Sequence, residues 1–264
     1  MDWRTRRQLT VLLIFSLFIF GIGGGLAFWV VSEPPTCTDD KKNQGEDEPD
    51  CGGPCAPCAF KRLRPVEVFF ARFIHVRPNT YDVVAQVQNP NDHLAANPLG
   101  YRVRVFDDQG AEIATRENVT HLYPNDKIYI IESNFVTERT VDHAAFEIVS
   151  ENTAWTYTEE IRPELTLGNR KYEVVREGAV EYGRATAELT NRAPLSFRNV
   201  EVRVTLLSKE GSVIAAGSTV VADVLAGESR LVTFTWPEKP IGTITRIDME
   251  ARANALDSRN LIPL

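Results

Sequence analysis

Cysteine and methionine are scarce in this sequence, and it has no long basic run beyond its first residues. All four cysteines lie within residues 37–58, so no disulfide can form within the chain that follows. The net charge is −7, and the clustered lysine and arginine that nucleic-acid binding needs are missing. The HExxH, GxSxG and glycine-rich phosphate-loop motifs are also missing, as is any nucleophile–base arrangement. We therefore expect no nucleic-acid partner and no enzyme activity.

One long apolar run is present, Leu9–Val31, and it carries no charged side chain. A helix over this run, rising about 1.5 Å per residue, is long enough to cross the roughly 30 Å hydrocarbon core of a bilayer. The flank before it, residues 1–8, contains Arg4, Arg6 and Arg7, and a basic excess marks the cytoplasmic side. We expect residues 9–31 to be a transmembrane helix in the lipid bilayer of the cell membrane, with the N-terminus cytoplasmic and the C-terminal domains extracytoplasmic.

A cleaved signal peptide is the alternative interpretation of this run. The chain has the basic start, the apolar stretch and the small-residue exit, near residues 25–27, that such peptides show. It nevertheless stays apolar through residues 28–31, where Phe28 and Trp29 suit a membrane interface. That continuation favours an uncleaved anchor.

Residues 32–64 have the composition of a stalk, rich in cysteine, proline, glycine and charge, with no apolar periodicity that could build a core. Its cysteines are Cys37, Cys51, Cys55 and Cys58. An even number in a short exported segment indicates two disulfides, and three pairings are open. Three other interpretations are a radical-SAM cluster, a thioredoxin-type redox pair at Cys55 and Cys58, and a zinc site of four thiolates. The exported location and the lack of a βαβ pattern favour structural disulfides.

The same segment offers a set of hard oxygen ligands: Asp39, Asp40, Asn43, Glu46 and Asp50. Carboxylate and amide oxygens are the ligands that Ca²⁺ takes in proteins. A solvated acidic loop is the alternative interpretation. The segment is therefore a candidate calcium site, and the sequence indicates no other cofactor.

The run CTDDKKNQGEDEPDCGGPCAPC resembles a short cysteine motif of secreted and surface proteins of bacteria, of the form C-x-D-G-I-x-N-x-x-E-…-D-C-G-G-x-C-x-x-C. The residues on the pattern are Cys37, Asp39, Asn43, Glu46, Asp50, Cys51, Gly52, Gly53, Cys55 and Cys58. Asp40 and Lys41 replace the usual glycine and isoleucine. The resemblance covers this segment alone, and it implies an extracellular disulfide-bonded module with no known catalysis.

The rest of the chain contains an internal repeat. YRVRVFDDQGAEIA (101–114) aligns with VRVTLLSKEGSVIA (202–215), and Tyr81 meets Tyr182 at the same offset. A period of roughly 100 residues indicates tandem domains, because solenoid repeats are about 20–50 residues long. The expected bounds are 65–150 for the first domain, 151–163 for a linker, 164–256 for the second domain and 257–264 for a tail.

Apolar and polar residues alternate in short runs within each copy, which predicts β-strands with one face toward a core. Examples are Tyr81–Gln88, Lys127–Asn134 and Ser229–Trp236. The segments 107–110 and 208–211 both end in the glycine that a tight hairpin connection favours. Candidate core residues in the first copy are Tyr101, Phe106, Phe135 and Phe146.

Short strands with almost no amphipathic helix are typical of an antiparallel β-sandwich. The predicted fold class is therefore mainly β: an N-terminal transmembrane helix, a small disulfide-stapled segment and two tandem antiparallel Ig-like β-sandwiches.

The two copies look like the FxLYD and LEA14-like immunoglobulin-type modules of bacterial envelope proteins. The first copy matches through Val87, Asn89, Val103, Val105, Phe106, Asp107, Gly110 and Ile113. The second matches through Leu189, Asn191, Val202, Val204, Leu207, Gly211, Ile214, Leu225, Gly227 and Glu228, with Ser208 where aspartate is usual. The resemblance implies a β-sandwich in the cell envelope without a shared enzymatic activity.

Together these features predict a single-pass, membrane-anchored, extracytoplasmic binding or scaffolding protein of the cell envelope, without catalytic activity. We expect its partner to be an envelope or surface protein or a glycan. Two alternatives are a thiol–disulfide active membrane protein using Cys55 and Cys58, and a membrane-anchored hydrolase with a polar pocket between the domains.

Overall fold

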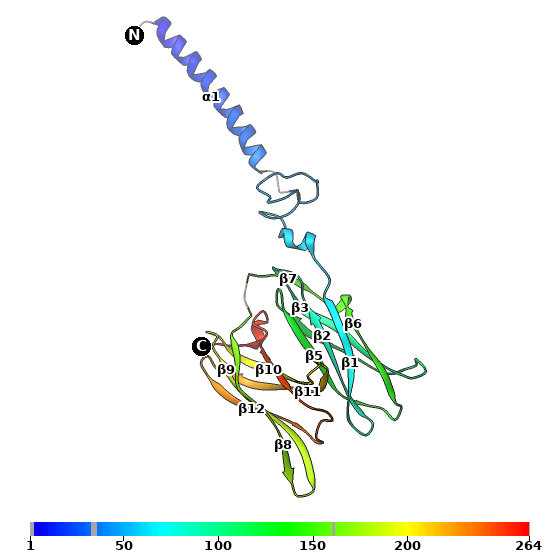
Figure 1. The fold of residues 1–264 in the computed structure, drawn as a ribbon. Helices are drawn as coiled ribbons and strands as arrows, with labels where there is room; N and C mark the ends of the chain where they lie inside the picture. Colours follow the sequence, from blue (N-terminus) through cyan, green and yellow to red (C-terminus); the bar gives the residue numbers. More distant parts are fainter. Residues whose placement is uncertain (1–2, 33–35, 160–161, 264) are drawn as a thin grey trace. The chain divides into compact units, whose positions relative to one another are not determined.

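The computed structural model describes residues 3–32, 36–159 and 162–263 (Figure 1). Within these ranges the chain is mainly β, with one long N-terminal helix followed by antiparallel sheets, so the predicted fold class is confirmed. Two compact units are present, Met1–Arg62 and Leu63–Leu264. Residues 1–2 of the N-terminal flank, 33–35 of the predicted stalk, 160–161 of the predicted linker and 264 of the predicted tail lie outside these ranges.

Helix α1 (Trp3–Ser32) contains the basic flank and the apolar run. From Arg6 to Leu26 it is apolar enough to cross a membrane, and none of this window is buried inside the protein. Large apolar side chains such as Phe15 and Phe18 are about two-thirds exposed, at 64% and 66%. A helix that is apolar on all sides needs an apolar environment, so α1 is consistent with a membrane anchor or a signal. The side chains of residues 27–32, on which the predicted aromatic interface depends, lie outside the described part.

Residues 36–62 are irregular, apart from the short 3₁₀ helix η1 (Cys58–Arg62) and one isolated bridge. Two disulfides hold this segment together, Cys37–Cys55 and Cys51–Cys58. Their Cα–Cα distances of 5.7 and 4.9 Å lie within the usual range. The structure thereby selects one of the three pairings that the sequence leaves open.

The first sandwich consists of the sheets β1–β2–β5 and β4–β3–β6, with β7 paired to β3. Its elements are β1 (Glu67–Arg77), β2 (Thr80–Gln88), β3 (Leu94–Asp107), β4 (Glu112–Leu122), β5 (Lys127–Val136), β6 (Val141–Val149), η2 (Ser150–Asn152) and β7 (Trp155–Tyr157). Side chains from both sheets form one core, which includes Val83 of β2, Val103 of β3 and Ile130 of β5.

Three of the four predicted aromatic core residues are buried in this sandwich: Tyr101, Phe135 and Phe146. The prediction for Phe106 is wrong. Val103 and Val105 point inward, so the period of two along β3 turns Phe106 outward. Its ring is partly exposed and stacks on the ring of His143 at 4.7 Å.

The second sandwich consists of the sheets β12–β9–β8 and β11–β10–β13, with β14 paired to β10 (Figure 1). Its elements are β8 (Leu165–Glu177), β9 (Val180–Asn191), β10 (Ser196–Leu207), β11 (Val213–Val224), β12 (Ser229–Trp236), β13 (Arg246–Arg252), η3 (Ser258–Asn260) and β14 (Leu261–Ile262). Leu189, Val204 and Trp236 belong to its core, and the indole N–H of Trp236 donates to the carbonyl of Ala216 at 2.9 Å.

Each sandwich has a buried asparagine at the end of its second strand. Asn89 follows β2 and Asn191 ends β9, and both are fully buried. The amide of Asn89 donates to the carbonyl of Tyr123 at 2.9 Å, and that of Asn191 donates to the carbonyl of Leu225 at 3.1 Å. Because a buried polar group must be paired, each asparagine fixes the turn that leads into the next strand of its sheet.

Candidate functional site

The turn between β4 and β5 carries the polar groups of the candidate site. Asn125 adopts a φ of 57°, a left-handed conformation that asparagine tolerates, and its N–H donates to the carbonyl of Asn91 at 3.0 Å. The carboxylate of Asp126 accepts a hydrogen bond from the N–H of Tyr123 at 3.3 Å. These bonds fix the direction in which the Asp126 side chain leaves the turn.

Asp126 lies between two guanidinium groups. Nη1 of Arg252, at the end of β13, lies 2.6 Å from Oδ2 of Asp126, and both side chains are almost completely buried. Nη1 of Arg162, in the segment that connects the sandwiches, lies 3.3 Å from Oδ1. Since a buried charge is stable only when paired, Asp126 and Arg252 hold β13 against the β4–β5 turn.

Tyr123 adds a second connection between the sandwiches. Its hydroxyl donates to the carbonyl of Ala253 at 3.0 Å and accepts from the N–H of Ala255 at 2.8 Å. Nearby, the guanidinium of Arg252 donates to the carbonyl of His121 at 2.9 Å. Burial lowers the pKa of His121 to about 3, and the positive charge of Arg252 acts in the same direction. His121 is therefore neutral around pH 7, as its position beside a cation requires.

A third connection comes from Arg203 on β10, whose guanidinium is buried. It donates to the carbonyl of Tyr129 on β5 at 2.6 Å and pairs with Glu201 at 2.7 Å and Glu250 at 3.4 Å. Burial acts to lower the pKa of Arg203, but the two carboxylates outweigh it and raise that pKa. Burial raises the pKa of Glu250, although the charges of Arg252, Arg203 and Arg162 oppose that shift.

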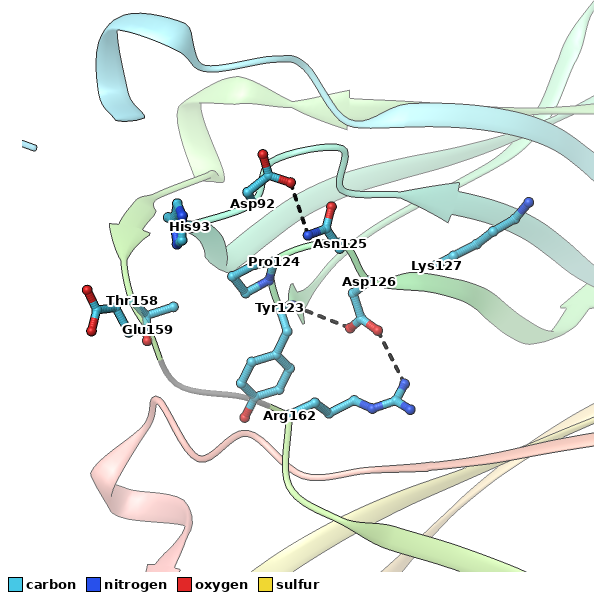
Figure 2. Close-up of a pocket in the computed structure, with 10 residues that line it drawn as sticks. All are labelled: Asp92, His93, Tyr123, Pro124, Asn125, Asp126, Lys127, Thr158, Glu159 and Arg162. Carbon is cyan, nitrogen blue, oxygen red and sulfur yellow. Dashed lines mark hydrogen bonds and ion pairs between the residues drawn. The ribbon is translucent and has the colours of Figure 1, made fainter. Parts of the chain in front are cut away.

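A cavity of about 600 Å³ opens beside the Tyr123–Asp126 turn (Figure 2). Figure 2 shows that its lining comes from the chain before β3, from the β4–β5 turn and from the connecting segment between the sandwiches. The lining residues are Asp92, His93, Tyr123, Pro124, Asn125, Asp126, Lys127, Thr158, Glu159 and Arg162. Most of these side chains are polar or charged, so the cavity suits a ligand that forms hydrogen bonds.

Neighbouring side chains hold several of the lining groups in place. The amide of Asn125 donates to a carboxylate oxygen of Asp92 at 3.2 Å (Figure 2). The ring of His93 lies 5.9 Å from that of Tyr157. The ammonium of Lys127 lies 3.9 Å from the centre of the Phe69 ring, and Phe69 occupies a shift in the β1–β2 register. A bulge of this kind re-aims a side chain, and here it leaves Phe69 about half exposed.

All four predicted cysteines form disulfides, and none of them is a free thiol. Cys55 is bonded to Cys37 and Cys58 to Cys51, so the CxxC sequence does not form its own disulfide. The redox interpretation needs that disulfide, and the zinc interpretation needs four thiolates, whereas no cysteine in the described chain is free.

Four of the five calcium candidates lie together beside these disulfides. The carboxylate of Asp39 accepts from the amide of Asn43 at 2.9 Å. That of Asp50 accepts from the N–H groups of Asp39 and Asp40 at 2.8 and 3.0 Å. Buried Glu46 accepts from the N–H groups of Asn43 and Asp50 at 3.3 and 3.1 Å. The carboxylates thus satisfy the backbone of a segment without strands, Asp40 contributes only its N–H to these bonds, and calcium binding stays a prediction.

No sequence pattern marks the residues that form the junction of the sandwiches. Residues 123–126 are recognisable as a turn, but Arg252 has the appearance of any strand arginine. Trp155 belongs to β7, which pairs with β3, and its side chain packs against the core of the first sandwich.

Neither a family model nor a curated protein matches this chain. Among solved structures, the chain is similar to red sea bream transglutaminase, with 13% sequence identity and a TM-score of 0.21. The similarity covers 73% of this chain but only 30% of the transglutaminase chain. At this identity and TM-score, it carries no argument about function.

Proposed function

We propose that this protein is a single-pass membrane protein that displays two β-sandwiches on the extracytoplasmic side, where they bind another component of the cell envelope without catalysing a reaction. The observation that carries the proposal is α1, whose apolar side chains from Arg6 to Leu26 are all unburied within the protein. Such a helix is stable in lipid and unfavourable in water.

Two features support the orientation. Arg4, Arg6 and Arg7 precede the apolar run and favour a cytoplasmic N-terminus. The disulfides Cys37–Cys55 and Cys51–Cys58 follow it, and disulfides persist where the environment is oxidising. Both features support export of the chain that follows α1.

The sandwiches supply the binding part of the proposal. Asn89 and Asn191 make corresponding hydrogen bonds, which supports the proposal that the sandwiches are copies of one domain like the FxLYD and LEA14-like modules. The cavity beside Asp126 supports a binding role, because it lies on strands and turns that hydrogen bonds and ion pairs hold in place.

The mature N-terminus tests the anchor. We expect mass spectrometry of the protein purified from membranes to find the sequence that begins before α1. A chain that begins near Phe28 would show a cleaved signal and contradict the anchor.

A fusion tests the orientation. Alkaline phosphatase joined after Leu264 should be active in cells, because that enzyme needs the oxidising side of the membrane. Replacing Arg4, Arg6 and Arg7 with glutamate should lower this activity by weakening the positive-inside signal. Equal activity of both fusions would contradict the proposed orientation.

In-cell photocrosslinking tests the binding role. A photoreactive residue at Asn125, beside the cavity, should give a defined adduct, whereas one at Glu177, at the β8–β9 hairpin, should not. Equal labelling at both positions would contradict binding at the cavity. A count of free thiols under denaturing, non-reducing conditions tests the thiol-active alternative, which requires reactive Cys55 and Cys58.

A further inference from the structure

We propose that the cavity beside Asp126 binds a neutral, hydroxyl-rich ligand of the saccharide class. The inference rests on the proposed function and specifies the ligand of its binding site. Four observations carry it: the balance of charge, the mixture of donors and acceptors, the anchoring of Asn125 and Asp126, and aromatic rings that contact two of the lining residues.

The charges around the cavity balance. Three carboxylates line it, those of Asp92, Asp126 and Glu159. Lys127 and Arg162 line it as well, and Arg252 lies behind Asp126 at 2.6 Å. A phosphate would meet three carboxylates, and a polyamine would meet two lining cations with the charge of Arg252 behind them, so both ionic classes meet repulsion. A ligand without net charge avoids both repulsions.

The lining includes both hydrogen-bond donors and hydrogen-bond acceptors. Asp92 and Glu159 only accept, Lys127 and Arg162 only donate, and the amide of Asn125 does both. A hydroxyl group donates and accepts at the same oxygen, so a ligand with several hydroxyls can pair with both kinds of group. A purely apolar ligand would pair with none of these side chains.

Part of the lining, Asn125 and Asp126, is held in place before any ligand binds. Asp126 contacts Tyr123, Arg162 and Arg252, and Asn125 is tied through its backbone to Asn91. A rigid site loses little conformational entropy on binding, which favours small ligands with few apolar contacts. Asn125 and Asp126 therefore keep their mutual positions in the free protein.

Aromatic rings lie next to the polar lining. Tyr157 packs beside His93 and is 38% exposed, and Phe69 lies under the ammonium of Lys127. A saccharide ring has apolar C–H faces as well as hydroxyls, so it can pack against an amphipathic aromatic edge while its hydroxyls bond to the cavity. The size of about 600 Å³ falls within the range of small-molecule sites.

Saturation-transfer NMR on the full-length protein in nanodiscs tests the inference. The neutral probes are maltotriose, cellotriose and chitotriose, and the charged probes are glucose 6-phosphate and spermidine. We expect at least one trisaccharide to bind and both charged probes to give no signal. Asp92→Asn and Asn125→Ala should each weaken that binding at least tenfold, whereas Asp108→Asn, in the exposed β3–β4 turn, should leave it unchanged.

Binding of a charged probe in place of the trisaccharides would overturn the inference, as would binding that Asp92→Asn and Asn125→Ala leave intact. Failure of all three trisaccharides to bind a chain with an unchanged melting temperature would also overturn it. The proposed function fails separately, through a cleaved N-terminus or an inactive phosphatase fusion. If photocrosslinking at position 125 captures a protein while no trisaccharide binds, the binding role stands and the saccharide inference falls.

Discussion

Arg252 and Asp126 form an ion pair that both sandwiches bury. Nη1 of Arg252 lies 2.6 Å from Oδ2 of Asp126, and only 0% and 4% of the two side chains are exposed. Arg252 ends β13 of the second sandwich, whereas Asp126 precedes β5 of the first. Taking two charges out of water costs several kcal/mol for each ion, so each partner depends on the other. The packing of the two sandwiches against each other therefore depends on the carboxylate of Asp126.

Asp126→Asn should lower the free energy of unfolding by about 3–5 kcal/mol, because it removes the carboxylate that pairs directly with the buried guanidinium of Arg252. Urea denaturation of the full-length protein in detergent at pH 7 measures the change. The control is Asp248→Asn, whose partner Arg246 is exposed, and we expect less than about 1 kcal/mol there. Adding Arg252→Met to Asp126→Asn should recover part of the loss, since the buried guanidinium is then removed as well. Equal losses for Asp126→Asn and Asp248→Asn would contradict the role of the pair.

Acid should destabilise the junction through His121. Its pKa is about 3 in the folded protein and about 6.5 when unfolded, so protonation favours the unfolded chain. The stabilisation is complete above pH 6.5 and is lost as the pH falls toward 3, by up to about 1.4 kcal/mol per pH unit. Glu250 acts in the opposite sense, because its raised pKa makes the folded chain take up a proton first. The comparison is therefore with His121→Gln, which removes only the histidine.

Urea denaturation at pH 6.5 and at pH 4.5 gives the measurement. The wild-type protein should lose up to about 2.7 kcal/mol more than His121→Gln between these values. Parallel losses in the two proteins would mean that His121 titrates normally in the folded state, and would contradict its burial beside Arg252.

The two buried asparagines should be similarly important in their sandwiches. Asn89→Ala and Asn191→Ala each remove a buried amide that donates to carbonyl groups of its turn, at about 0.5–1.5 kcal/mol for each hydrogen bond lost. Asn199→Ala is the control, because its side chain is exposed, and it should change stability by no more than about 0.5 kcal/mol. Differential unfolding in urea compares the three variants. A value for Asn89→Ala or Asn191→Ala as small as the control would show that the amide is dispensable.

Thiol counting should reveal the disulfide pairing. Removing a bonded pair with Cys37→Ser and Cys55→Ser should leave no reactive thiol, because Cys51 and Cys58 stay bonded. Removing one member of each pair, with Cys37→Ser and Cys58→Ser, should leave two thiols without their native partners. Labelling with a maleimide under denaturing, non-reducing conditions measures the difference. Two reactive thiols in the first variant would contradict the observed pairing.

Local patterns anticipated the strands closely. The predicted run Ser229–Trp236 coincides with β12, and Tyr81–Gln88 differs from β2 by one residue. Gly110 and Gly211 both adopt positive φ in their hairpin turns. These features follow from alternation and from the freedom of glycine at positive φ, which depend on neighbouring residues alone. Phe106 was misplaced because its apolar character suggested burial, whereas its place in the alternation directs it outward.

The sequence by itself determined the apolar helix, the β-rich fold and the presence of two disulfides in the segment that holds all four cysteines. Tertiary structure decided which cysteines pair, which carboxylates serve the backbone, and that Asp126 meets Arg252. The physical reason is that periodicity and turn propensity act between neighbours along the chain. The partner of a buried charge, in contrast, is set by which strands the folded cores bring together.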